Sequence, residues 1–281
     1  MIDFIYVSHV ERMLASLAYW KGVDLRDLKK WNLKGLVQWL EAFEKREAYL
    51  AFKSDYYTHV MDIPPQYGPG YDGGFEKERK QFANSINGRD GKSWHLPLGH
   101  DDPLQPLYKG PPLPLCVLEA MNLHPSSSSG SYEACDETIM AKACRSMAAW
   151  KLASNGANVA KFAARGGPEG AKNPRKTFSA PLADPYAESD VDIQPTVDAV
   201  LRIVCRVMLL WDDDVDNNKN NKLPSAEWRQ ALKDAVPAQQ VDGVVSSLGY
   251  LRDRVGIPRD LPLAAARYLR AYLNWAIDAL E

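Results

Sequence analysis

The last 22 residues, DLPLAAARYLRAYLNWAIDALE at positions 260–281, carry the clearest folding signal in the chain. Apolar side chains recur there every three or four residues, which is the spacing of one face of an α-helix. The residues on that face are Leu269, Tyr272, Leu273, Ala276, Ile277 and Leu280. Pro262 stands near the predicted first turn, where proline is favoured because its missing N–H would be unpaired anyway. The stretch therefore predicts a long C-terminal helix with a wide buried face.

The same spacing extends outward over most of the sequence. It predicts helices over 2–20, after Asn32, over 49–60, 75–86, 135–164 and 196–211, from about Ser225, and over 244–255. Residues 61–132 differ, because proline and glycine are frequent there and turn signals recur. We therefore predict an all-α protein in three parts: helices in 1–60, an irregular Pro/Gly-rich insert in 61–132, and a helical tail in 133–281.

Composition narrows the class of protein. The chain has 281 residues, 46% of them hydrophobic, which excludes global disorder. The formal net charge is −2, and this balance argues against a nucleic-acid partner. Four scattered cysteines do not suggest a disulfide framework, which favours an intracellular protein. The most apolar stretch, 199–211, contains Arg202 and Arg206 and is too short to span a bilayer.

Two stretches in the first third resemble the helical C-terminal domain of glutathione transferases. Asp3, at the start of an apolar helix, matches the aspartate of the family's N-capping box, in which a carboxylate binds free backbone N–H groups. The segment 37–49 resembles the last conserved helix of that domain, with Glu47 in place of its usual proline. The matching residues in that helix are Trp39, Leu40, Phe43, Arg46, Ala48 and Tyr49.

The tail is similar to that of long transferase-like proteins from photosynthetic microbes, on the stretches 163–166, 182–187 and 250–260. Glutathione transferases bind glutathione through an N-terminal thioredoxin-like half, and no such pattern precedes Met1. The resemblance thus implies a fragment of a transferase or a non-catalytic relative, with glutathione as a cofactor only if the other half exists. It also implies a cytoplasmic or organellar location, plastids included, and leaves a protein partner or a homodimer open.

The residues 216–227 resemble the calcium loop of an EF-hand. The predicted oxygen ligands are Asp216, Asn218, Asn220, the carbonyl of Lys222, and Glu227. Asn221 takes the position that needs a left-handed backbone, and a helix is predicted on each side. Pro224 departs from the pattern at position 9, where a polar side chain or water is usual. Two interpretations stay open: a calcium site, or a solvated Asp/Asn-rich loop.

Other candidate groups carry weaker signals. The aromatic residues of 39–57 predict either a ligand groove or ordinary core. His9 and His59 are expected at the core or its boundary, and Cys144 and Cys205 are expected to be inert buried thiols. The three functional hypotheses are therefore a transferase-like protein, a calcium-binding helical module, and a structural scaffold with neither activity.

Overall fold

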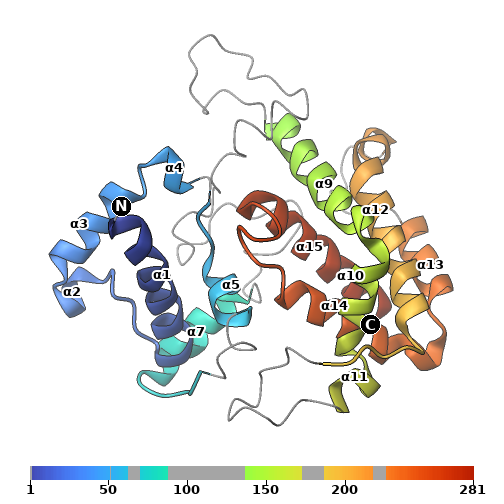
Figure 1. The fold of residues 1–281 in the computed structure, drawn as a ribbon, viewed down its shortest axis with the longest axis horizontal. Coiled ribbons are helices and arrows are strands. Elements are labelled where there is room, and N and C mark those ends of the chain that lie inside the picture. The colour runs from blue at the N-terminus through green and yellow to red at the C-terminus, as the bar shows by residue number, and fades with distance from the viewer. Residues whose placement is uncertain (1, 51, 63–69, 88–136, 173–186, 218–225) are drawn as a thin grey trace.

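A computed structural model describes residues 2–50, 52–62, 70–87, 137–172, 187–217 and 226–281. Throughout these ranges the regular structure is helical and contains no strand, which confirms the predicted all-α class. Figure 1 shows the first helices on one side of the molecule and the later helices on the other. The predicted insert, 61–132, lies largely outside the described residues.

The first helices surround one apolar core. They are α1 (Ile2–Lys21), α2 (Leu28–Trp31), α3 (Lys34–Phe43), α4 (Glu47–Leu50), α5 (Tyr56–Met61) and α7 (Glu76–Ile86). Leu14, Leu40 and Ile86 are among the buried residues that join α1, α3 and α7 in this core. A smaller cluster of Val7, Phe43 and Tyr49 extends the core toward α4. We call these helices and their connections the N-terminal unit.

Gly22 ends the first helix because its backbone is left-handed, with φ +67°. Glycine adopts this conformation without the steric cost that a side chain brings. A β-carbon at this position would lie 2.3 Å from the carbonyl oxygen of Phe75, just before α7. The chain can therefore pack the start of α7 tightly against the end of α1.

The later helices form a larger body. They are α9 (Glu137–Ser154), α10 (Gly156–Ala163), α11 (Pro168–Lys172), α12 (Gln194–Asn217), α13 (Ala226–Ala235), α14 (Val241–Asp253) and α15 (Leu263–Leu280). Short 3₁₀ turns at Ala164–Gly166 and Ala238–Gln240 connect some of them. The helix α15 packs against α9, α12, α13 and α14, and the predicted apolar face of its sequence is buried. We call these elements the C-terminal body.

The helix α5 joins the two parts of the molecule. Its N-cap, Asp55, accepts hydrogen bonds from both the backbone N–H and the hydroxyl of Thr58. The same carboxylate is bound by Arg270 of α15, with 2.9 Å between Nη1 and Oδ2. One aspartate therefore both starts the helix and fastens it to the C-terminal body.

Three further contacts strengthen this junction. Tyr57 donates a hydrogen bond to Asp253, and Arg252 donates to the Tyr57 hydroxyl at 3.1 Å. Arg259 pairs with Asp62 at 3.4 Å, just beyond the end of α5. The junction is thus polar and distributed over most of the length of α5.

Several local expectations need correction. The helix predicted over 135–164 is two helices, divided at Asn155 and Gly156. Within the predicted apolar helices, Phe4, Ile5, Trp150 and Leu209 are exposed, Trp150 at 69% and Leu209 at 55%. These four residues fit helical spacing but lie on solvent-exposed positions of α1, α9 and α12. The helix α12 also runs six residues beyond its predicted end.

Candidate functional site

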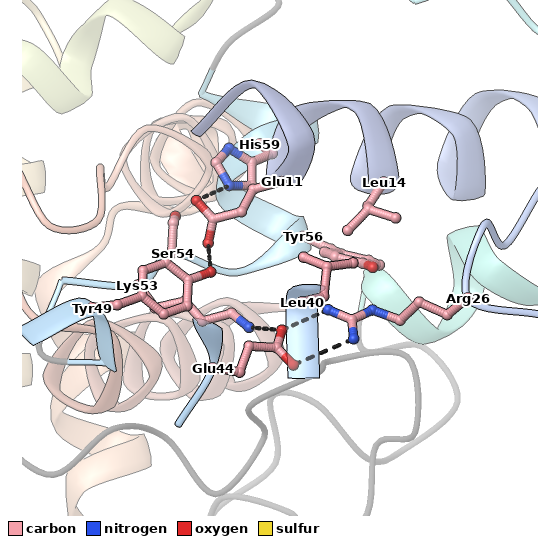
Figure 2. Close-up of a pocket in the computed structure, with 10 residues that line it drawn as sticks. All are labelled: Glu11, Leu14, Arg26, Leu40, Glu44, Tyr49, Lys53, Ser54, Tyr56 and His59. Atoms are coloured by element: carbon pink, nitrogen blue, oxygen red, sulfur yellow. Dashed lines mark hydrogen bonds and ion pairs between the residues drawn. The ribbon is translucent and has the colours of Figure 1, made fainter. Parts of the chain in front are cut away.

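A small pocket opens inside the N-terminal unit, among α1, α3, α4 and α5. Its cavity volume is about 10 Å³, roughly the space that one water molecule needs. Figure 2 shows that charged side chains from separate elements meet around it. The lining residues are Glu11, Leu14, Arg26, Leu40, Glu44, Tyr49, Lys53, Ser54, Tyr56 and His59.

Two cations share one carboxylate on one side of the pocket. Arg26 donates to both oxygens of Glu44, at 2.5 and 3.3 Å, and the Lys53 amine lies 2.5 Å from Oε1. Figure 2 shows Arg26 and Lys53 approaching Glu44 from opposite sides. Burial lowers the pKa of Lys53, and the nearby Glu44 carboxylate opposes part of that fall. This trio is strongly hydrogen-bonded, so its polar groups are largely satisfied.

A second carboxylate, Glu11 of α1, has fewer partners. Its Oε1 accepts a hydrogen bond of 2.6 Å from the hydroxyl of Tyr49. Burial, followed by the charge of Glu11, raises the pKa of Tyr49, so the phenol stays protonated and acts as the donor. Its Oε2 faces Nε2 of His59 at 3.8 Å, which is too long for a hydrogen bond. The Glu11 carboxylate is therefore bound firmly on one side only.

Three buried polar atoms in residues that line the same pocket have no hydrogen-bond partner: Nε2 of His59, Oγ of Ser54 and Nε of Arg26. His59 and Ser54 are 9% and 7% exposed, so bulk water solvates them poorly. Buried polar groups in folded proteins are nearly always hydrogen-bonded, to protein or to an ordered molecule. Three such atoms around one cavity leave hydrogen-bonding capacity for a guest of about the size of a water molecule.

The predicted calcium loop lies mostly outside the described residues: Asn218, Asn220 and Lys222 are not covered. Asp216 falls in the last turn of α12, and Glu227 is exposed in the first turn of α13. A helix precedes the segment and another follows it, as expected. These two helices pack against each other. Elsewhere, no group of three or more metal-binding side chains is found among the described residues.

The residues that resemble the transferase family lie close together in space. The indole N–H of Trp39 donates to Oδ1 of Asp3 at 3.2 Å, which joins α3 to the start of α1. The rings of Phe43 and Tyr49 meet edge to face, with centroids 4.7 Å apart. The aromatic series from 39 to 57 is mainly core, although Phe52 is exposed and Tyr49 and Tyr56 also line the pocket.

Comparison with known protein families and with curated proteins found no match to this sequence. Among the described helices, none is both long enough and apolar enough to cross a membrane. Because the comparisons found no match, the interpretation of the pocket rests on the chemistry of the residues that line it.

The charged residues of the pocket were not predicted from the sequence. Glu11 and Glu44 sit directly beside apolar helix positions, at Val10 and Phe43. A charge at the edge of an apolar stripe is usually solvated, because the next turn leaves it open to water. Here Lys53 binds Glu44 and Tyr49 binds Glu11, and nothing in the periodicity predicts these contacts.

Proposed function

We propose that this chain is a non-catalytic binding protein, related to the C-terminal domain of glutathione transferases, that holds a small polar molecule in the pocket of its N-terminal unit. The observation that carries the proposal is the pair of buried, unpartnered atoms His59 Nε2 and Ser54 Oγ, which belong to residues that line the pocket. A guest that bonds both would remove the cost of leaving them unsatisfied, which is about 1–3 kcal/mol for each group.

Binding is favoured over catalysis because the pocket hydroxyl is not activated. A serine nucleophile needs a base within hydrogen-bond reach. Ser54 Oγ makes no such bond to His59 or to Glu11. The proposed relationship to transferases is supported by the contact between Asp3 and Trp39, two residues on which the resemblance rests. Glutathione conjugation is proposed only together with a thioredoxin-like half, and no strand of such a domain occurs in the described ranges.

A panel of small probes tests the binding function. Methylammonium, acetate, acetamide and ethanol should be titrated into the ¹⁵N-labelled protein, and amide shifts of residues 49–60 should be followed. We expect at least one probe to shift them saturably in the wild type and more weakly in Ser54→Ala. Ser154→Ala, which removes an exposed hydroxyl, is the matched control. If no probe shifts these amides, the binding function is wrong.

Calcium binding at 216–227 is a second candidate function. It is favoured by the position of Glu227, which is exposed in the first turn of α13, as a bidentate ligand at position 12 would be. The described part of α12 reaches Asn217 and α13 begins at Ala226, so a described helix stands on each side of the proposed ligands. This spacing supports a helix–loop–helix arrangement, with Asp216, Asn218, Asn220 and Lys222 as the other proposed ligands.

Titration calorimetry with calcium tests this candidate. We expect weak binding in the wild type, since the loop offers two carboxylates, and at least a tenfold loss in Glu227→Gln. Glu76→Gln is the control, because Glu76 is also exposed in the first turn of a helix. Equal binding by wild type and Glu227→Gln would contradict the site. If neither calcium nor any probe binds, the scaffold hypothesis gains support.

A further inference from the structure

We propose that an exposed surface around α2, both basic and apolar, docks on an anionic phospholipid membrane. We call it the α2 surface. It consists of Leu28, Lys29, Lys30, Leu33, Lys34 and Phe75, all of them exposed. Figure 1 shows α2 at the outer edge of the N-terminal unit, on the side away from the C-terminal body. None of the six residues lines the pocket, so this inference is independent of the proposed function.

The backbone of α2 is held at both ends. The carboxylate of Asp27 accepts hydrogen bonds from the backbone N–H groups of Lys29 and Lys30, at 3.0 and 3.2 Å. Asn32 ends the helix in a left-handed conformation, and its N–H donates to the carbonyl of Leu28 at 3.1 Å. One turn of helix is not stable by itself, so these caps fix the positions from which the lysine side chains project.

The lysines of the α2 surface carry charge that the described protein does not neutralise. Among the described residues, no carboxylate forms an ion pair with Lys29, Lys30 or Lys34. Over residues 27–34 these three lysines stand against one acidic residue, Asp27, whose carboxylate is bound to backbone N–H groups. A negatively charged surface is therefore the complementary partner.

The acidic residues on either side of Phe75 do not cancel this charge. Asp72 pairs with Arg79 at 3.0 Å, and Glu76 pairs with Lys80 at 2.7 Å. Each of these carboxylates is thus offset by a cation of its own segment. The positive charge on α2 and at the start of α3 remains available to an external anion.

Exposed apolar side chains lie among the lysines. Leu28 and Leu33 stand on either side of Lys29 and Lys30 in the sequence, and both are exposed. The Lys30 amine lies 3.5 Å from the centroid of the exposed Phe75 ring, which places a charge directly beside an apolar side chain. Single exposed apolar residues are ordinary, but basic and apolar side chains together are typical of surfaces that lie at a membrane interface.

This combination favours lipid over a nucleic acid. A nucleic acid is bound through many phosphate contacts, often about 6–10, and aliphatic side chains add little to them. The two leucines and the phenylalanine gain free energy only where they leave water. An anionic bilayer offers negative headgroups to the lysines and, just below them, an apolar region to these three side chains. Lysine stems are apolar as well, so they can follow while the amines stay among the headgroups.

Co-sedimentation of the full chain with lipid vesicles tests the docking. The vesicles contain phosphatidylcholine alone, or phosphatidylcholine with about 30% phosphatidylserine as the anionic lipid. We expect binding to the anionic vesicles that is at least tenfold stronger than binding to the neutral ones. It should weaken when NaCl is raised from about 0.1 to about 0.5 M, because salt screens exposed charges.

Charge reversal locates the surface. Lys29→Glu/Lys34→Glu should bind the anionic vesicles at least tenfold more weakly, since each basic side chain near such a bilayer contributes about a fivefold factor. Lys161→Glu/Lys233→Glu makes the same change in net charge at exposed positions of α10 and α13, and it should bind like the wild type. Should the first double variant lose its native circular dichroism, Lys34→Glu replaces it, with at least a threefold loss expected.

The apolar contribution is tested with the charge unchanged. Leu33→Ser should weaken vesicle binding at least threefold, because the leucine side chain no longer leaves water. Soluble polyglutamate is the comparison ligand. Absence of binding to anionic vesicles, equal binding to both kinds of vesicle, or equal losses in the two double variants would overturn the proposal. Polyglutamate binding as strong as vesicle binding, with no effect of Leu33→Ser, would also overturn it and would assign the surface to an acidic protein instead.

Discussion

Arg270 of α15 binds both carboxylate oxygens of Asp55, a residue 215 positions earlier in the chain, at 2.9 and 3.2 Å. The two side chains are 0% and 2% exposed, so the ion pair is removed from solvent. Arg270 also donates to the hydroxyl of Thr58 and to the carbonyl of Val255. This pair therefore anchors α5 of the N-terminal unit to the C-terminal body.

Removing one partner of this pair should destabilise the protein strongly. Arg270→Met leaves the Asp55 carboxylate buried without its main cation, and we expect a loss of about 3–5 kcal/mol in the free energy of unfolding. Asp55→Asn should cost less, because asparagine can still cap α5. In urea denaturation, the double variant should lose clearly less than the sum of the two single losses. Strict additivity would contradict a direct pair.

The ion pair between Asp55 and Arg270 predicts that the folded protein loses stability at low pH. Burial would raise the pKa of Asp55, but the charges of Arg270 and Arg267 and the hydrogen bonds from Thr58 outweigh it, so its pKa falls below the ordinary 3.8. A carboxyl whose pKa is lower in the folded state stabilises the fold above its unfolded pKa, and that contribution is lost as pH falls through the folded value.

We therefore expect wild-type stability to fall steeply below about pH 4, the ordinary range of aspartate. Urea unfolding measured between pH 6 and pH 2 checks this. Asp55→Asn, which has no proton to take up at this position, should show a shallower decline over the same interval. Parallel curves for the two proteins would contradict the assignment.

Gly22 gives a test of backbone conformation. Gly22→Ala should destabilise by more than about 1 kcal/mol, since φ is +67° and the new β-carbon would lie 2.3 Å from the Phe75 carbonyl oxygen. Gly35→Ala, inside α3 and with no other atom within 4 Å of the added carbon, is the matched control. It should stabilise by about 0.5–1 kcal/mol. Thermal unfolding of both variants tests whether the two changes have opposite signs.

Two thiols are predicted to be unreactive in the native protein. Burial raises the pKa of Cys144 to about 12 and that of Cys205 to about 11. Because the thiolate is the nucleophile, alkylation by iodoacetamide at pH 7.5 should be slow at both sites and fast after unfolding in urea. Peptide mass spectrometry gives the rate at each site. Equal rates in native and unfolded protein would contradict the burial of these cysteines.

The sequence predicted the helices well and the contacts between them poorly. The face of α15 that runs from Leu269 to Leu280 is buried as expected. Apolar residues at helical spacing directly indicate the buried face of a helix. Gly22 ends α1, because a left-handed position selects glycine. The short helix α2 was not predicted, since one turn shows no periodicity, and the single helix predicted over 49–60 is wrong, because α4 ends at Leu50 and α5 begins at Tyr56.

The candidate site was harder to predict for a physical reason. The apolar spacing of α1 and of α5 does not depend on Glu11 or His59, so it gives no reason to single them out. Only the packing of α5 against α1 places the two side chains together. Likewise, nothing local in the sequence links Asp55 with Arg270, because an ion pair across 215 positions leaves no spacing signature. The calcium-loop motif was visible, since its ligands are close in sequence, and it remains a prediction.

Although the helix α5 spans only Tyr56–Met61, its residues contact two different parts of the molecule. Tyr56 and His59 line the pocket, while Tyr57 and the N-cap Asp55 bind the C-terminal body. A ligand that prefers the docked position of α5 would strengthen docking by the same factor by which docking strengthens its own affinity, because thermodynamic coupling between sites is reciprocal. The pocket and Arg270 would then be allosteric partners, joined by less than two turns of helix.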